Sequence, residues 1–206
     1  MDPETIAAYE RSASIRCAHY RLIMPTELRR FAHSAFHLGQ PTADIGCGSG
    51  RDVAWLNEHD FPTVGYDASP AMLTQARQAY PSIVVREDHL PELASIADAS
   101  YTNILCSATL MHVSAADLPR AISSLARILQ ANGRLLLSVR SSRTDSEREA
   151  DGRLFTPISN SWLEGQLIGV GLTISAVRQD TDWYRKGITW LTMLAEKADV
   201  AALGGM

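Results

Sequence analysis

Residues 44–52 read DIGCGSGRD and bring Gly46, Gly48 and Gly50 close together in the chain. Glycine loses more backbone freedom on folding than any other residue, so this density indicates a backbone that must come close to another group. The residues before this segment are typical of a strand, and those after it are typical of a helix. A strand, a glycine-rich turn and a helix N-terminus form an arrangement that binds nucleotides. The segment therefore predicts an α/β fold with a ligand at this turn.

The spacing of this loop argues against a dinucleotide. The dinucleotide fingerprint is G-x-G-x-x-G, in which a small third residue lets the helix pack on the strand. Here the spacing is G-x-G-x-G, and the bulky Arg51 takes the place of the third glycine. Asp44 lies two residues before the first glycine, where a fixed negative charge suits an ammonium or sulfonium group better than a pyrophosphate. The loop therefore favours a cationic ligand over NAD.

Two acids further along the chain follow predicted strands. Asp67 lies 21 residues after Gly46, and an acid at about that distance can accept hydrogen bonds from ribose hydroxyls. The alternative for Asp67 is a helix cap, because Ser69 and Pro70 follow it. Asp88 follows the next strand, where its carboxylate or the adjacent backbone could meet an adenine amino group. The alternative for Asp88 is a simple turn acid.

Strand-like and helix-like segments alternate along most of the chain of 206 residues. Apolar periodicity predicts helices near residues 4–22, 26–36, 51–59, 70–79, 115–130 and 159–169. Strands are expected near residues 42–45, 62–66, 82–86, 101–106, 134–139, 171–179 and 187–196. The helix over 115–130 is expected to end on a cap at Asn132 and Gly133. Strands that alternate with helices indicate βαβ units and a parallel sheet.

Composition narrows the classes of function. The net charge of −4 and the isoelectric point near 5.8 argue against a protein that binds duplex nucleic acid. The three cysteines are widely spaced, which indicates a reducing compartment and neither a disulfide framework nor a zinc knuckle. The N-terminus does not read as a signal peptide, and no apolar run approaches the roughly 20 residues that cross a bilayer. We therefore expect a cytoplasmic protein without a metal site.

Several segments in order carry a family resemblance: DIGCGSGRD, YDAS, REDHLP, SATLMHV and LARILQANGRLLLSVR. Together they resemble a class I S-adenosylmethionine (SAM)-dependent methyltransferase. The resemblance implies a Rossmann-like, doubly wound sheet of seven strands, with order 3-2-1-4-5-7-6 and strand 7 antiparallel, inside a three-layer α/β/α fold with N-terminal capping helices. It also implies one methyltransferase domain over residues 1–206, divided into a helical cap (1–37), a cofactor-binding half (38–140), and a substrate loop with a C-terminal hairpin (141–206).

The resemblance further implies which residues meet the cofactor, SAM, and its product S-adenosylhomocysteine (SAH). The three glycines and Cys47 form the loop beside the methionine and ribose, Asp67 and Ala68 hold the ribose, and Asp88 and His89 flank the adenine. Asp44 lies near the amino end of the methionine, and Cys106 faces that portion through its backbone carbonyl. Tyr20 belongs to a helix that closes over the cofactor, although core packing explains it equally well.

The residues that would meet the methyl acceptor are less sharply marked. His112 follows the fourth strand and is a candidate general base, because a histidine pKa suits proton transfer near neutral pH. A packed, structural histidine is the alternative. Arg140 and Arg143 belong to a polar segment that is either a substrate lid or a self-paired surface. Trp183 and Tyr184 are candidates for the pocket rim, whereas Trp190 is expected in the core or on the sheet face.

The sequence supports methyl transfer from SAM to a small-molecule acceptor, in a monomer or a homodimer without a membrane partner. Two alternatives stay open: a methyltransferase that acts on tRNA or protein, and a SAM-binding module without catalysis. Alignment and desolvation do most of the work in methyl transfer, so a base is needed only if the nucleophile arrives protonated. For this reason the sequence predicts a reaction class without fixing a catalytic side chain.

Overall fold

The structure is a computed structural model that describes residues 1–141, 148–182 and 187–199. The helices are α1 (Pro3–Leu22), α2 (Thr26–Ala35), α3 (Arg51–Glu58), α4 (Pro70–Ala79), α5 (Leu118–Ile128) and α6 (Asn160–Gly169), with a short 3-10 helix η1 (Leu110–His112). The strands are β1 (Thr42–Ile45), β2 (Thr63–Asp67), β3 (Val84–Glu87), β4 (Tyr101–Ser107), β5 (Leu129–Arg140), β6 (Leu172–Thr181) and β7 (Thr189–Lys197).

The strands form one seven-stranded sheet with the order β3-β2-β1-β4-β5-β7-β6. The strands β1 to β5 run parallel to one another, and β7 runs antiparallel to both of its neighbours. The predicted fold class, strand order and antiparallel seventh strand are therefore confirmed. Because the order reverses between β1 and β4, the carboxyl ends of these two strands open a crevice at the position where such sheets bind ligands.

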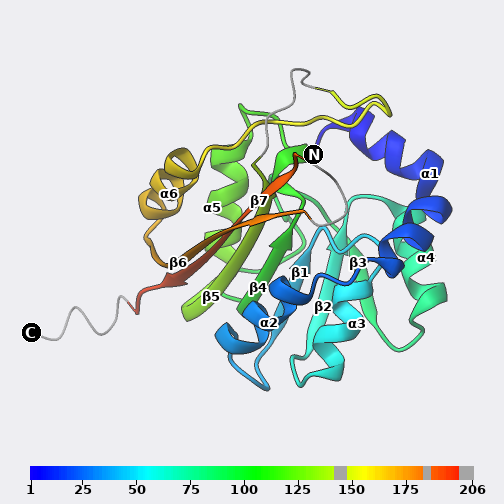
Figure 1. Cartoon of the computed structure of the whole chain (residues 1–206). Helices are drawn as coiled ribbons and strands as arrows, with labels where there is room; N and C mark the ends of the chain where they lie inside the picture. The colour runs from blue at the N-terminus through cyan, green and yellow to red at the C-terminus, as the bar shows by residue number, and fades with distance from the viewer. Residues whose placement is uncertain (142–147, 183–186, 200–206) are drawn as a thin grey trace, which may run out of the picture.

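Helices cover both faces of the sheet and give three layers (Figure 1). The helices α5 and α6 pack on one face, against alternate residues of β4, β5 and β7 such as Ile104, Leu137 and Met193. The opposite face carries α2, α3 and α4; Leu136 of β5 points to this side. This alternation follows from the period-2 geometry of strands, which sends successive side chains to opposite faces.

The N-terminal helix α1 lies across α4 and supplies the predicted cap. Its Cys17 is fully buried in a cluster that contains Met72 of α4, and Glu10 accepts a hydrogen bond from the Ala71 backbone N–H at 3.1 Å. Ser12 departs from helical geometry, with φ −127°, and its hydroxyl donates to the Ala8 carbonyl at 2.7 Å. A hydroxyl that bonds back to the preceding turn bends a helix, so α1 curves over the crevice.

The helix over residues 115–130 ends earlier than the sequence predicts. It ends at Ile128, and β5 already begins at Leu129; Asn132, with φ +60°, lies inside this strand where its pairing with β4 is irregular. The Lys197 ammonium of β7 donates to the carbonyls of Ala126 and Leu129 at 2.7 and 2.8 Å. A distant lysine thus satisfies carbonyls that helix ends leave unpaired, and a local glycine cap is not needed.

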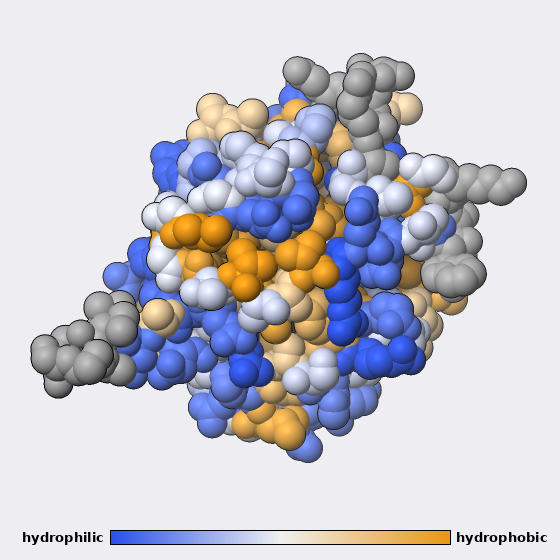
Figure 2. Space-filling model, turned by 60° about the vertical axis from the view of Figure 1, so that its left-hand side comes forward, coloured by the Kyte–Doolittle hydropathy of each residue, from blue (hydrophilic) through white to orange (hydrophobic). Residues whose placement is uncertain are grey.

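Several large hydrophobic side chains stay exposed: Ile15, Leu22, Met24, Leu38, Val84, Ile168 and Val177. Figure 2 shows one face of the molecule on which hydrophobic residues gather at the centre and hydrophilic residues surround them. Contiguous exposed apolar surface of this kind is typical of sites that receive a ligand or a partner.

Candidate active site

A cavity of about 1270 Å³ lies at the carboxyl ends of the parallel strands. Its lining includes residues that follow β1, β2, β3 and β4, together with α1, the connection from α1 to α2, and parts of β5, β6 and β7. Pockets for drug-sized ligands measure about 300–1,000 Å³, so this cavity has room for more than one small molecule. The crevice is therefore large enough for a cofactor and a second ligand side by side.

The glycine loop is shaped by two close approaches. Gly46 has φ +78°, and a Cβ added to it would lie 2.1 Å from the Thr109 hydroxyl oxygen. Gly50 has φ +73°, and its added Cβ would collide with Ile83 at 2.6 Å. Gly46 and Gly48 line the cavity, whereas Gly50 lies outside its lining and serves packing between the loop and β3. Of the three glycines that the sequence places beside a ligand, two line the cavity and Gly50 does not.

Asp44 presents its carboxylate to the cavity. The residue is only 3% exposed, and among the described residues the carboxylate has no hydrogen-bond or ion-pair partner. Burial raises its pKa well above the ordinary value, and the negative charges of Asp52 and Asp67 add to this. An unpartnered buried carboxylate is costly, so a cationic group that enters the cavity at this point would be bound strongly.

Asp67 joins the glycine loop to the start of α4. One carboxylate oxygen accepts from the Gly48 backbone N–H at 2.8 Å, and the other accepts from the Ser69 N–H at 2.9 Å. Ser69 itself caps α4, because its hydroxyl accepts from the Met72 N–H. Asp67 and Ala68 both line the cavity, and each carboxylate oxygen keeps a lone pair for a further donor. The cap of α4 is therefore Ser69 and not Asp67, whose carboxylate holds the turn before the helix and faces the cavity.

Asp88 and His89 lie together in the cavity wall beyond β3. The Asp88 carboxylate accepts from the His89 N–H at 2.7 Å and from the Ser95 N–H at 2.8 Å. The His89 ring nitrogen Nδ1 lies 3.1 Å from the Leu90 carbonyl oxygen. Both oxygens of Asp88 accept hydrogen bonds from within the turn. The backbone of this segment is therefore better placed than the carboxylate to contact a flat ring.

Tyr20 and Arg51 meet where α1 ends beside the loop. Both line the cavity. The Arg51 guanidinium donates to the carbonyls of Tyr20 and Ile23 at 3.0 and 3.1 Å and pairs with Asp52 at 2.5 Å. The arginine that replaces the third glycine of the dinucleotide fingerprint thus ties α3 to the C-terminus of α1. Tyr20 also packs against the cluster of Cys17 and Met72, as the core-packing alternative expects, so it both lines the cavity and closes α1 onto α4.

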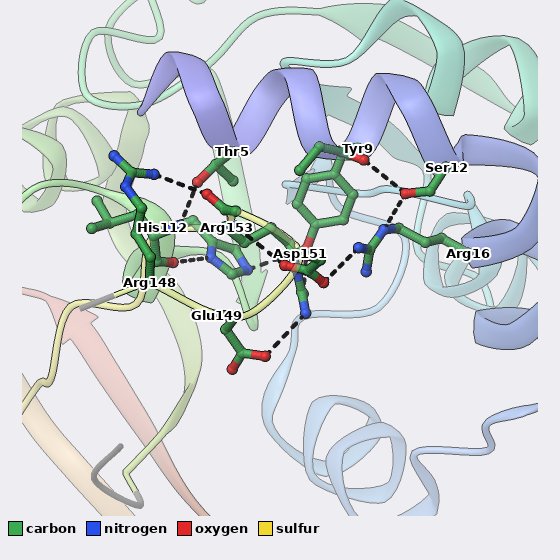
Figure 3. A network of polar contacts seen from close by, with 12 residues as sticks. Thr5, Tyr9, Ser12, Arg16, His112, Arg148, Glu149, Asp151 and Arg153 are labelled. Carbon is green, nitrogen blue, oxygen red and sulfur yellow. Dashed lines mark hydrogen bonds and ion pairs between the residues drawn. The ribbon is translucent and has the colours of Figure 1, made fainter. Parts of the chain in front are cut away.

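His112 is buried at the cavity wall within a polar network (Figure 3). Its Nδ1 lies 2.7 Å from the Leu154 carbonyl oxygen and donates to it. The remaining nitrogen, Nε2, then accepts from the Tyr9 hydroxyl at 3.2 Å. Arg153 donates to the same hydroxyl oxygen at 3.3 Å and pairs with Asp151 at 3.0 Å. The network fixes the neutral form of His112 and occupies both of its nitrogens.

The expectation of a histidine pKa near neutrality is corrected by this burial. His112 is 4% exposed, and desolvation lowers its pKa from 6.5 to about 4. A base this weak removes a proton poorly from a thiol or a phenol, whose pKa values lie near 8.5–10, and less still from an alcohol. The surroundings of His112 therefore suit a residue that orients its neighbours better than they suit a general base.

The lowered pKa makes stability depend on pH. The neutral imidazole stabilises the fold fully above pH 6.5, and this contribution is lost as pH falls toward 4. From pH 7 to pH 4 we expect a loss of about 3 kcal/mol that His112→Gln does not share. Urea unfolding at a series of pH values measures it, with His19→Gln, an exposed histidine, as control. Identical pH profiles for wild type and His112→Gln would contradict the assignment.

The other residues expected near an acceptor are placed differently. Arg140 lies outside the cavity lining; its guanidinium pairs with Glu149 at 2.5 Å and lies over the Phe155 ring. Arg143, Trp183 and Tyr184 lie outside the described residues. Cys106 is 1% exposed in the core beneath the cavity and does not line it, whereas the adjacent Ser107 does. Cys47 lines the cavity as expected.

Sequence reasoning missed most of the lining on the side of β5 and β7. Ser138 of β5 and Thr192 of β7 are register partners whose hydroxyls lie 3.3 Å apart, and both are buried. Trp190, expected in the core or on the sheet face, lines the cavity, and its ring N–H donates to Asp182 at 3.1 Å. The alternation of side chains along β7 places residues 190 and 192 on one face, which was a signal that they act together. The pairing of β7 with β5 is not visible in the sequence.

The comparison with protein families adds to this geometry. A family model described as a methyltransferase domain matches residues 43–137. This match covers slightly less than half of the chain, and over these residues the chain is similar to that family. The matched segment runs from β1 through most of β5 and contains the glycine loop, Asp67 and Asp88. The resemblance to a methyltransferase domain that the sequence predicts is therefore confirmed over this segment.

Individual relatives agree with this assignment. The chain is similar to the uncharacterized methyltransferase YodH of Bacillus subtilis, with 28% identity over 104 residues that cover 47% of this chain and 42% of that protein. It therefore spans less than half of the length of the curated relatives that it matches. An S-adenosylmethionine-dependent methyltransferase from Mesorhizobium loti is 21% identical with a TM-score of 0.71, and the match covers 83% of this chain and 96% of that one.

A further structural neighbour matches nearly the whole chain. It is the Burkholderia thailandensis 1,6-didemethyltoxoflavin-N1-methyltransferase, determined with bound 1,6-didemethyltoxoflavin and S-adenosylhomocysteine. The two chains are 22% identical with a TM-score of 0.70, and the match covers 97% of this chain and 92% of the neighbour. The shared fold thus includes the β6–β7 hairpin as well as the first five strands.

Two kinds of feature are absent from the described part of the chain. Within residues 1–141, 148–182 and 187–199, no group of three or more His, Cys, Asp or Glu side chains could hold a metal ion. In the same part of the chain, no helix combines the length and the apolar character that crossing a membrane requires.

Proposed function

We propose that this chain transfers the methyl group of SAM to a small-molecule acceptor. The observation that carries the proposal is one cavity of about 1270 Å³ that connects the Asp44 and Asp67 end of the crevice with a second region beside Trp190. At one end, carboxylates and the backbone of the glycine loop can contact a cofactor. The other end has room for an acceptor. Both would lie within one continuous cavity, as direct transfer between them requires.

The residues at the first end fit SAM. The unpartnered Asp44 carboxylate suits the α-ammonium of the methionine portion, and the remaining lone pairs of Asp67 suit a ribose diol. Backbone near Asp88 and His89 would bound the adenine. When bound, SAM supplies a methyl group already activated on a sulfonium. The contribution of the chain is to align the acceptor, to exclude water and to balance the positive charge.

Two findings favour a small acceptor over a macromolecule. α1 bends over the crevice, and the segment that follows residue 147 is tied to it, because Arg148 pairs with Asp2 at 2.9 Å and Asp151 pairs with Arg16 at 2.7 Å. The described arginines of that segment are therefore engaged with acids and do not form an open basic surface. The Burkholderia neighbour, which covers the same elements, was determined with a small heterocycle bound.

Calorimetry and a transfer assay test the proposal. We expect SAH to bind one-to-one in isothermal titration. Incubation of the protein with SAM labelled on the methyl group should move label into the small-molecule fraction of a cell extract. Label in the RNA or protein fraction would favour the macromolecular alternative. Binding of SAH without transfer to any fraction would favour a binding module, and no binding of SAH would refute the cofactor assignment.

A further inference from the structure

Three hydroxyl side chains lie in one row across neighbouring strands at the cavity wall. Ser107 of β4 is the register partner of Ser138 of β5, and Ser138 is the register partner of Thr192 of β7. These strands are neighbours in the sheet (Figure 1). All three residues line the cavity, and Ser138 and Thr192 are buried. We name these three residues the hydroxyl row.

The residues two positions earlier on the same strands are all leucines. Leu105 of β4 pairs with Leu136 of β5, which pairs with Leu194 of β7, and all three belong to the buried core cluster on the α2 side. Side chains two positions apart on a strand point to the same face, so the hydroxyl row continues this row of leucines toward the cavity. A buried hydroxyl without a partner costs free energy, so packing alone favours apolar residues here. The change to hydroxyls indicates a role toward the cavity.

The hydrogen bond between Thr192 and Ser138 directs the Ser138 hydroxyl. Thr192 donates to the Ser138 oxygen at 3.3 Å. A hydroxyl has one proton and two lone pairs, so Ser138 keeps its own proton for another acceptor. Within the described part of the chain, no group accepts that proton, and the side-chain hydroxyl of Ser107 makes no hydrogen bond. Two O–H donors in the cavity wall are therefore available to a ligand.

The spacing of these two donors selects the ligand groups that can meet both. Neighbouring strands lie about 4.8 Å apart, so register partners hold their side chains at about that distance. The oxygens of one carboxylate or one phosphate lie much closer together, so a single such group cannot meet both hydroxyls at once. Two carbonyl oxygens that flank one ring nitrogen, as in a cyclic imide, have a spacing close to that between strands. The edge of an imide ring therefore fits along the hydroxyl row.

We propose that Ser107 and Ser138 donate hydrogen bonds to two carbonyl oxygens of the methyl acceptor, which is a ring compound of the cyclic imide class. This inference rests on the proposed function of the cavity. Thr192 is a positioning residue, because its own hydrogen bond leaves the Ser138 proton to the ligand. Asp44 is the register partner of Leu105, which lies two positions before Ser107. An acceptor on the hydroxyl row would thus lie beside the proposed cofactor end.

Three probes with one bicyclic frame test the inference: phthalimide, isoindolin-1-one and indane carry two, one and no carbonyl groups. Each is titrated into the full chain saturated with SAH, and ligand-observed NMR at pH 7 measures affinity without turnover. One hydrogen bond contributes a factor of about five in affinity. We therefore expect Ser107→Ala and Ser138→Ala each to weaken phthalimide about fivefold. The double variant should weaken phthalimide about 25-fold and isoindolin-1-one only about fivefold, and indane should not respond.

Two further variants complete the design. Ser124→Ala removes a buried serine of α5 that lies outside the cavity lining, and it should leave all three affinities unchanged. Thr192→Val keeps the shape of the side chain but removes its donated hydrogen bond, so phthalimide should bind about threefold more weakly. Thr192→Ser keeps the hydroxyl and should restore the affinity for phthalimide, which a purely structural role of Thr192 does not predict.

The outcomes separate this inference from the function on which it rests. Failure of SAH to bind the wild type would remove the proposed function itself. With SAH bound, the inference alone is overturned if no probe binds, or if the serine variants weaken indane as much as phthalimide. It is also overturned if the double variant weakens isoindolin-1-one as much as phthalimide, or if Ser107→Ala weakens SAH and not phthalimide. If Ser138→Ala does not fold, Ser107→Ala and Thr192→Val decide.

Discussion

In isothermal titration, the Asp67→Ala variant should bind SAH at least about 100-fold more weakly than the wild type. The carboxylate accepts the Gly48 and Ser69 backbone N–H groups at 2.8 and 2.9 Å while facing the cavity. Alanine removes the predicted acceptor of two ribose hydroxyls and leaves these N–H groups without their partner. Hydrogen bonds to a charged group contribute about 1.5–3 kcal/mol each, and two of them account for the expected factor.

Two controls separate binding from folding. Asp67→Asn keeps the shape and one acceptor oxygen, so we expect an intermediate loss of affinity. Asp98→Ala removes an exposed acid paired with Arg127 on the surface and should leave SAH affinity unchanged. If Asp67→Ala binds SAH like the wild type while remaining folded by circular dichroism, then Asp67 does not hold the ribose.

The Gly46→Ala substitution should lower the free energy of unfolding by about 3 kcal/mol or more. The new Cβ would lie 2.1 Å from the Thr109 hydroxyl oxygen and 2.6 Å from its methyl carbon, which no rotation of alanine relieves. The residue also has φ +78°, a conformation that costs an L-residue about 1–2 kcal/mol. Urea unfolding at pH 7 measures the effect, and SAH binding should fall with it because the loop must shift.

Gly171→Ala is the matched control that measures the cost of a positive φ alone. Gly171 has φ +82°, and nothing lies within 4 Å of its added Cβ, so only the cost of positive φ remains, about 1–2 kcal/mol. The difference between the two variants isolates the collision with Thr109. The double substitution Gly46→Ala with Thr109→Ala should recover part of the loss. Equal destabilisation by Gly46→Ala and Gly171→Ala would show that the close approach costs nothing.

Much of the cofactor end could be predicted from the sequence because its features are local. The glycine spacing, Asp44 at the end of β1 and Asp67 at the end of β2 all depend on short-range order along the chain. The strand order followed from the family resemblance, and the sheet confirms it. The end of α5 was predicted wrongly because its carbonyls are satisfied by Lys197, a residue about 70 positions away.

The sequence by itself determined that the glycine loop, Asp44 and Asp67 lie at one crevice. Each is placed there by a short local run of strand, turn and helix. Only the tertiary structure decided what faces the rest of that crevice. Cross-strand register brings Ser138 to Thr192, and burial changes the pKa of His112. Register and desolvation depend on which distant segments pack together, and no spacing within one segment encodes that contact.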